Sequence, residues 1–96
     1  MKTVTLVHHR VTDFDAWKAV YDGFRDVQRE RGVKHHHVWR SKEDPGMVVV
    51  VHTFDSEGAA RAFFDAPELQ EAMAEAGVDA SSVHVAFLEE ADGGAL

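Results

Sequence analysis

Residues 33–54 read VKHHHVWRSKEDPGMVVVVHTF, and this stretch indicates the fold more clearly than any other part of the sequence. Two segments rich in strand-forming residues, 33–40 and 47–54, flank a segment at 41–46 that is dense in turn formers. The stretch therefore predicts an antiparallel β-hairpin. Its second arm is apolar at odd and even positions alike, so both faces of the resulting sheet need a cover.

The flanking segments complete a β-α-β-β-α-β order. The predicted elements are a strand at 3–11, a helix at 12–31, the hairpin strands at 33–40 and 47–54, a helix at 55–76 that Pro67 interrupts, and a strand at 82–89. We therefore predict the α+β class with a ferredoxin-like split βαβ arrangement: an antiparallel four-stranded sheet with both helices on one face.

The uncovered face of this sheet predicts self-association. The chain has 96 residues and no cysteine, so its core is small and disulfides cannot reinforce it. Helices cover one apolar face, and the same face of a second copy is the simplest cover for the other. We expect a homodimer.

Composition excludes several classes of partner. The net charge of −7 argues against nucleic acid and anionic membrane surfaces as main partners. The longest apolar run, 47–51, is far shorter than the ~20 residues of a membrane-spanning helix, and the first residues lack a signal-peptide core. We expect a cytoplasmic protein with one domain at 1–89 and a flexible acidic tail at 90–96.

All seven histidines fall in predicted strands: His8, His9, His35, His36, His37, His52 and His84. A symmetric hairpin would pair His35 with His52 and place His37 on the same face, where His8 or His9 could join them. Three neutral imidazoles suit Zn, Cu, Ni or Fe, which makes His35, His37 and His52 the candidate metal ligands. The same group could instead serve as general acid and base, or form hydrogen bonds in a polar dimer interface.

Aromatic side chains form a stripe at helical spacing between Phe14 and Phe24. Within it, Trp17 and Tyr21 each carry a polar group that needs a partner when buried, and a planar aromatic substrate would stack well against them. The candidate substrate-binding residues are Trp17, Tyr21, Trp39 and Phe64. The sequence has no phosphate-binding glycine loop, nucleophile elbow or dinucleotide fingerprint.

Three motifs resemble a known superfamily. They are HRVTDFDAWKAVYD at 9–22, DPG at 44–46 before the Val-rich strand, and APELQEAM at 66–73 before AGV at 76–78. Over residues 3–89 the chain resembles the dimeric α+β barrel superfamily, in particular antibiotic-biosynthesis monooxygenases and relatives described as small cyclases. The resemblance implies a pocket between helices and sheet in each subunit, and it marks His9, Trp17 and Tyr21. The triple histidine at 35–37 departs from the family pattern.

The leading functional hypothesis is a small cofactor-independent enzyme of monooxygenase or cyclase type, acting on an aromatic or polyketide-like molecule. Its candidate catalytic residues are His9, His52 and His37. One alternative is an enzyme that uses a transition metal or haem at the histidine cluster. Another is a dimer that binds a ligand or responds to stress without catalysis.

Overall fold

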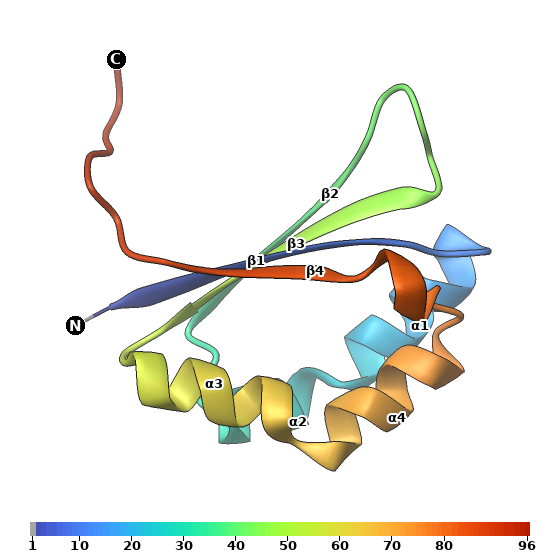
Figure 1. The fold of residues 1–96 in the computed structure, drawn as a ribbon, viewed down its shortest axis with the longest axis horizontal. Helices are drawn as coiled ribbons and strands as arrows, with labels where there is room; N and C mark the ends of the chain where they lie inside the picture. The colour runs from blue at the N-terminus through green and yellow to red at the C-terminus, as the bar shows by residue number, and fades with distance from the viewer. Residues whose placement is uncertain (1) are drawn as a thin grey trace.

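The computed structural model describes residues 2–96 and has a four-stranded antiparallel sheet in the order β2-β3-β1-β4, with its helices on one face (Figure 1). The elements are β1 (Thr3–Arg10), α1 (Phe14–Gly23), α2 (Arg25–Glu30), β2 (His35–Arg40), β3 (Met47–Phe54), α3 (Glu57–Asp65), α4 (Pro67–Glu75), the 3-10 turn η1 (Ala80–Ser82) and β4 (His84–Leu88). This confirms the predicted ferredoxin-like α+β class.

Local signals set most of the helix ends. The side chain of Asp13 accepts a hydrogen bond from the Ala16 amide, and Ser56 caps α3 in the same way. Pro67 opens α4 as a separate helix, because proline fits the first turn, where no intrahelical donor is needed. The predicted helix at 12–31 is in fact two helices, which separate at Phe24 directly after the weak helix former Gly23.

Alternation along the two central strands gives the sheet two different faces. On β1 and β3 the buried positions alternate with half-buried ones, and the buried side chains face the helices. There they form two apolar clusters, one around Trp17 and Val48 and the other around Phe54 and Phe63. No helix of the described chain covers the opposite face (Figure 1). We call this opposite face the bare face; its apolar residues are Val4, Leu6, Trp39, Met47, Val49, Val51, Ala86 and Leu88.

The predicted hairpin register is wrong by one residue. His36 pairs with His52, and His35 pairs with Thr53. The reason lies in the turn, where the Asp44 carbonyl accepts from the Met47 amide and the Asp44 side chain accepts from the Gly46 amide. This turn centres the hairpin on Asp44 itself rather than between Asp44 and its predecessor, and the shift moves each side chain of β2 to the other face.

The C-terminal residues 89–96 form no helix or strand and are exposed. The division into a domain and a flexible tail therefore stays a prediction. No helix within residues 2–96 has both the length and the apolar character needed to cross a bilayer.

Candidate active site

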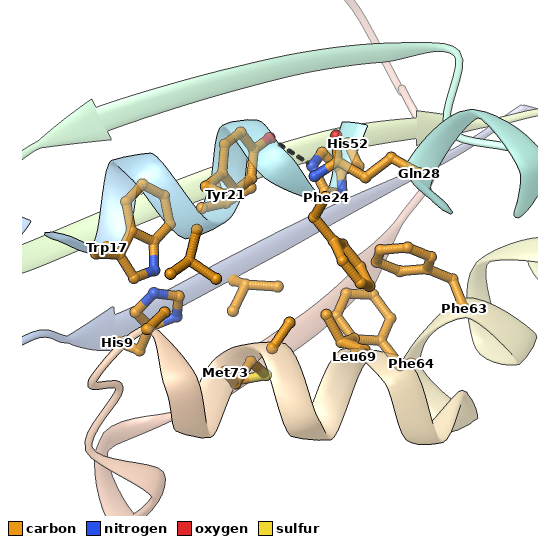
Figure 2. A pocket seen from close by; sticks show the side chains of 15 residues that line it. His9, Trp17, Tyr21, Phe24, Gln28, His52, Phe63, Phe64, Leu69 and Met73 are labelled. Carbon is orange, nitrogen blue, oxygen red and sulfur yellow. Dashed lines mark hydrogen bonds between the residues drawn. The ribbon is translucent and has the colours of Figure 1, made fainter. Parts of the chain in front are cut away.

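A cavity that is partly open to solvent lies between the helix-covered face of the sheet, helices α1 and α2, and helix α4, and we call it the internal cavity (Figure 2). Its volume of about 70 Å³ is enough for about five water molecules. Most of its lining is apolar, and the clearly polar side chains are His9, Tyr21, Gln28 and His52. A largely apolar cavity with a few polar groups is the usual form of a small-molecule site.

His9 projects from β1 into this cavity, and its side chain is only 4% exposed. Within residues 2–96, neither ring nitrogen has a hydrogen-bond partner. Burial, and secondly the nearby charge of His8, lower the pKa of His9 to about 4. The imidazole is therefore neutral at pH 7, with one nitrogen lone pair free to accept a proton.

Tyr21 and His52 form the second polar group of the cavity. The Tyr21 hydroxyl lies 2.8 Å from Nε2 of His52, as the dashed line in Figure 2 marks. Burial lowers the pKa of His52 to about 4, with smaller contributions from His36 and Arg25, while burial raises the pKa of Tyr21. Both groups are therefore uncharged at neutral pH, and the tautomer of His52 decides which of them donates in this hydrogen bond.

The two polar groups lie at separate positions along the sheet. His9 pairs with Val48 and His52 pairs with Thr5, so the two histidines are offset by four residues along the strands. At the usual rise of a strand, this offset is about 13 Å. The cavity therefore has a neutral base at one end and a Tyr–His pair toward the other, with apolar walls between them.

Aromatic rings form much of the wall. Trp17 stacks on Tyr21 with ring centroids 4.9 Å apart, and His9 lies tilted against Trp17 at 5.8 Å. Phe64 contributes from α3, where its ring meets Phe63 edge to face. Trp17, Tyr21 and Phe64 therefore line the cavity, and flat rings pack well against such walls, but their binding roles stay predictions.

The predicted cluster of His35, His37 and His52 does not form. His52 faces the helices, whereas the corrected register places His35 and His37 on the other face of the sheet. In the described part of the chain, no group of three or more His, Asp or Glu side chains could hold a metal ion. The sequence-based metal site is therefore wrong in its geometry.

Two further predicted site residues lie away from the cavity. Trp39 is 54% exposed and stacks on His37 at 5.2 Å, outside the cavity lining. The roles predicted for Trp39 and His37 depended on the incorrect register, because they required the odd-numbered residues of β2 to face the helices. Side chains alternate along a strand, so the observed register places His37 and Trp39 on the bare face instead.

Sequence reasoning missed two polar residues near the cavity. Gln28 is 2% exposed and lines the cavity, although it interrupts the apolar stripe of the first helical segment. A polar residue on an apolar stripe was the available signal. His36 pairs with His52, and its ring lies 6.2 Å from that of Tyr21. Only the true register reveals the position of His36.

Comparisons with solved structures support the fold. The cofactor-independent oxygenase SnoaB from Streptomyces nogalater superimposes with a TM-score of 0.80 at 9% identity, over 96% of this chain and 95% of that one. Rv0793 from Mycobacterium tuberculosis superimposes with a TM-score of 0.72 at 18% identity, over 99% of this chain and 100% of that one. A dimeric ferredoxin-like protein of unknown function from Jannaschia sp. superimposes with a TM-score of 0.72 at 17% identity, over 94% of this chain and 100% of that one.

Sequence comparison gives a family. No curated protein matches the chain. The family model described as antibiotic biosynthesis monooxygenase matches residues 8–75, which is more than half of the chain and includes His9, Trp17, Tyr21 and His52. The chain therefore belongs to the antibiotic biosynthesis monooxygenase family.

Proposed function

We propose that this protein is a cofactor-independent monooxygenase that oxidises a flat aromatic molecule in the internal cavity, with His9 as the base. The observation that carries the proposal is the state of His9: buried, neutral, and without a hydrogen-bond partner inside residues 2–96. A buried polar group normally has a partner, so an unpaired imidazole in a cavity is suited to meet a substrate.

The reaction balances without an added reductant. His9 takes a proton from an activated CH₂ group, and the resulting carbanion passes one electron to O₂. The two radicals combine into a peroxide anion, which takes up a proton. Loss of the second hydrogen of the CH₂ group as a proton, with cleavage of the O–O bond, gives a ketone and water. Overall, substrate-H₂ and O₂ yield substrate=O and H₂O.

The cavity supports both parts of this reaction, formation of the carbanion and protonation of the peroxide. Apolar walls exclude water around the carbanion, and an aromatic substrate spreads the charge over its ring system. The His9 imidazolium formed in the first step lies beside the reacting carbon and can return its proton to the peroxide. A substrate larger than the present cavity has to displace side chains, and the flexible Met73 on α4 is the most adaptable of them.

Independence from a cofactor is supported by two observations. The structurally similar protein from Streptomyces nogalater is described as a cofactor-independent oxygenase. The histidines of this chain are also divided between the two faces of the sheet instead of forming a ligand set.

We also propose a homodimer formed through the bare face. The similar protein from Jannaschia sp. is described as dimeric. The central bare-face positions, Leu6 paired with Val51 and with Ala86, are apolar on three neighbouring strands. A second copy of this face is the complement that its chemistry favours.

The test is oxygen uptake with an anthrone, a flat aromatic ketone with an acidic CH₂ group. The wild-type protein, freed of metals and haem, should consume one O₂ per anthrone and place one ¹⁸O atom from ¹⁸O₂ in the ketone. His9→Gln should reduce kcat by about 10²–10⁴-fold, the usual contribution of a positioned base.

His8→Gln is the matched control, because His8 is the sequence neighbour of His9 but faces the other side of the sheet. It should change kcat less than twofold at a protein concentration that maintains assembly. A folded His9→Gln protein with full activity would exclude His9 as the base. Activity that appears only after addition of haem or a transition metal would contradict the cofactor-independent mechanism, and inactivity of the wild type on all acidic aromatic C–H compounds would favour non-catalytic binding.

A further inference from the structure

A second, open cavity adjoins the internal one between α2 and β2. We call it the α2–β2 cleft; its volume is about 430 Å³. The residues that line it are Arg25, Gln28, Arg29, Val33, Lys34, His35 and His36. Gln28 lines both this cleft and the internal cavity, so the two spaces meet at its side chain.

The lining of this cleft is cationic although the chain carries a net charge of −7. Three cations and two imidazoles line it, and no carboxylate does. Arg25 is the least exposed of the three cations, with 27% of its side chain accessible, against 71% for Arg29 and 51% for Lys34. Arg25 is therefore the cation that water screens least.

Carboxylates outside the cleft offset this charge only in part. Arg25 lies 3.6 Å from Asp22, Arg29 lies 3.3 Å from Asp26, and Lys34 lies 3.8 Å from Asp55. Half or more of each carboxylate side chain is exposed, and Asp22 is shared with Lys18. Exposed pairs of this kind are weak, so the cations remain available to a ligand.

A different groove beside the internal cavity has the opposite charge. A groove between α1 and α4 shares Val20, Phe24 and Ala72 with the internal cavity, and Glu68, Glu71 and Glu75 line it. Glu68 pairs with Arg31, but no ion pair within residues 2–96 involves Glu71 or Glu75. An anionic molecule is therefore repelled at this groove and attracted at the α2–β2 cleft.

Gln28 supplies a polar contact at the junction. Its side chain is 2% exposed, and its Oε1 has no hydrogen-bond partner in residues 2–96. An amide here can accept from a substrate hydroxyl or, after a flip of its end group, donate to an anionic oxygen. The unpaired Oε1 of this amide, which lines the cleft together with Arg25, suits a polar end of a ligand better than an apolar end.

We propose that the α2–β2 cleft binds the anionic end of the substrate, a carboxylate or phenolate on an aromatic ring, with Arg25 as the anchoring residue. The proposal rests on the proposed function only in placing the aromatic body inside the cavity. The ligand then lies with its charged end at Gln28 and Arg25 and its opposite end toward His9. The substrate class becomes an acidic aromatic compound, oriented by charge.

Binding of a matched pair of probes tests this orientation without any turnover. Naphthalene-2-carboxylate and the neutral naphthalene-2-carboxamide are titrated into the wild type, Arg25→Gln, Arg25→Lys and Arg61→Gln by calorimetry. The wild type should bind the carboxylate more tightly. Arg25→Gln should lower the affinity for the carboxylate about tenfold or more, as expected for loss of a charge-assisted hydrogen bond. It should change the affinity for the carboxamide less than twofold.

The other two variants separate local from general charge effects. Arg25→Lys keeps the charge and should retain a preference for the carboxylate. Arg61→Gln removes one positive charge at Arg61 of α3, which lines neither the cavity nor the cleft, and should alter neither affinity by more than twofold. The proposal would be overturned if Arg25→Gln reduced the affinity for both probes equally or for neither. It would also be overturned if the wild type bound the carboxamide more tightly than the carboxylate. These measurements involve no oxygen and no turnover, so their outcome does not depend on whether the protein is an oxygenase.

Discussion

Two consecutive histidines on β1 have different environments. His9 is buried beside Trp17 in the cavity, whereas His8 faces the other side of the sheet and stacks on His84 with ring centroids 4.6 Å apart. The residue type is the same, and the difference comes only from the alternation of the strand. At the scale of the residue, the face a side chain occupies determines whether it can act in the cavity.

The buried histidines should make stability depend on pH between about 4 and 6.5. The pKa of His9 and of His52 is about 4 in the folded protein, against an ordinary value of 6.5. Above pH 6.5 both are neutral in either state. As pH falls toward 4, the unfolded chain binds protons that the folded chain does not, so the free energy of unfolding decreases by roughly 3 kcal/mol per histidine.

Urea unfolding at a series of pH values measures this dependence. His9→Gln should remove about half of the decrease that these two histidines cause between pH 6.5 and 4, since their pKa values are lowered equally. Below pH 4 these two histidines should cause no further loss. A free energy of unfolding that stays constant from pH 7 to pH 4 would show that neither imidazole is buried in its neutral form.

At the scale of elements, glycine conformation decides how α4 ends. Gly77 follows this helix with a φ of +76°, and a Cβ at this position would lie 2.8 Å from Oγ1 of Thr12. Gly77→Ala should therefore lower the free energy of unfolding by about 1–2 kcal/mol, the cost of left-handed backbone for an L-residue.

Gly23→Ala is the matched comparison. Gly23 ends α1 without a positive φ, and a Cβ added there would have no neighbouring atom within 4 Å. This substitution should leave stability unchanged or raise it by up to about 1 kcal/mol. Urea unfolding of both variants checks the difference, and the explanation fails if Gly77→Ala is as stable as Gly23→Ala.

Elements were predictable from sequence where a local signal exists. The Asp13 and Ser56 caps, the start of α4 at Pro67 and the hairpin itself follow from short-range chemistry. The register of the hairpin does not, because five of the six residues of β2 are exposed and no alternation of burial favours one register. The hydrogen bonds of Asp44 decide it, and every sequence-based statement about His35, His37 and Trp39 depended on that turn.

The candidate site was predictable only in part, for the same reason. His9, Trp17 and Tyr21 were found because a contiguous motif carries them on β1 and α1. Gln28 and His36 were missed because their importance arises from pairing between segments distant in sequence. Long-range geometry, rather than residue type, places these two groups at the junction of cavity and cleft.

On the scale of the whole molecule, one sheet serves two purposes. Its helix-covered face holds the cavity, and its bare face has apolar side chains on all four strands. A chain of 96 residues buries too little surface to make such an exposed face harmless. The proposed association through this face would therefore support the same strands that position His9 and His52.

Leu6→Asp should dissociate the proposed dimer. Leu6 lies centrally on the bare face, paired with Val51 and Ala86, and a carboxylate there would be buried without a partner in the assembly. The dimer dissociation constant should rise at least about 100-fold, a cost of roughly 3 kcal/mol. Sedimentation velocity over a range of concentrations measures the change.

Ala62→Asp is the control for added charge, since Ala62 is exposed on α3 among the helices and not on the bare face. It should assemble as the wild type does. A wild-type protein that stays monomeric at high concentration, or a Leu6→Asp protein that dimerises normally, would refute the interface.

The alternation of His8 and His9 also limits how the gene can change in length. A single residue inserted or deleted in β1 before His8 would move each later side chain of the strand to the opposite face. His8 would then lie in the cavity and His9 on the bare face. One such event would displace the proposed base and alter the proposed interface together. The loop at 41–46 or the residues after β4 can absorb a change in length without this inversion, so viable insertions and deletions should be confined to these connections.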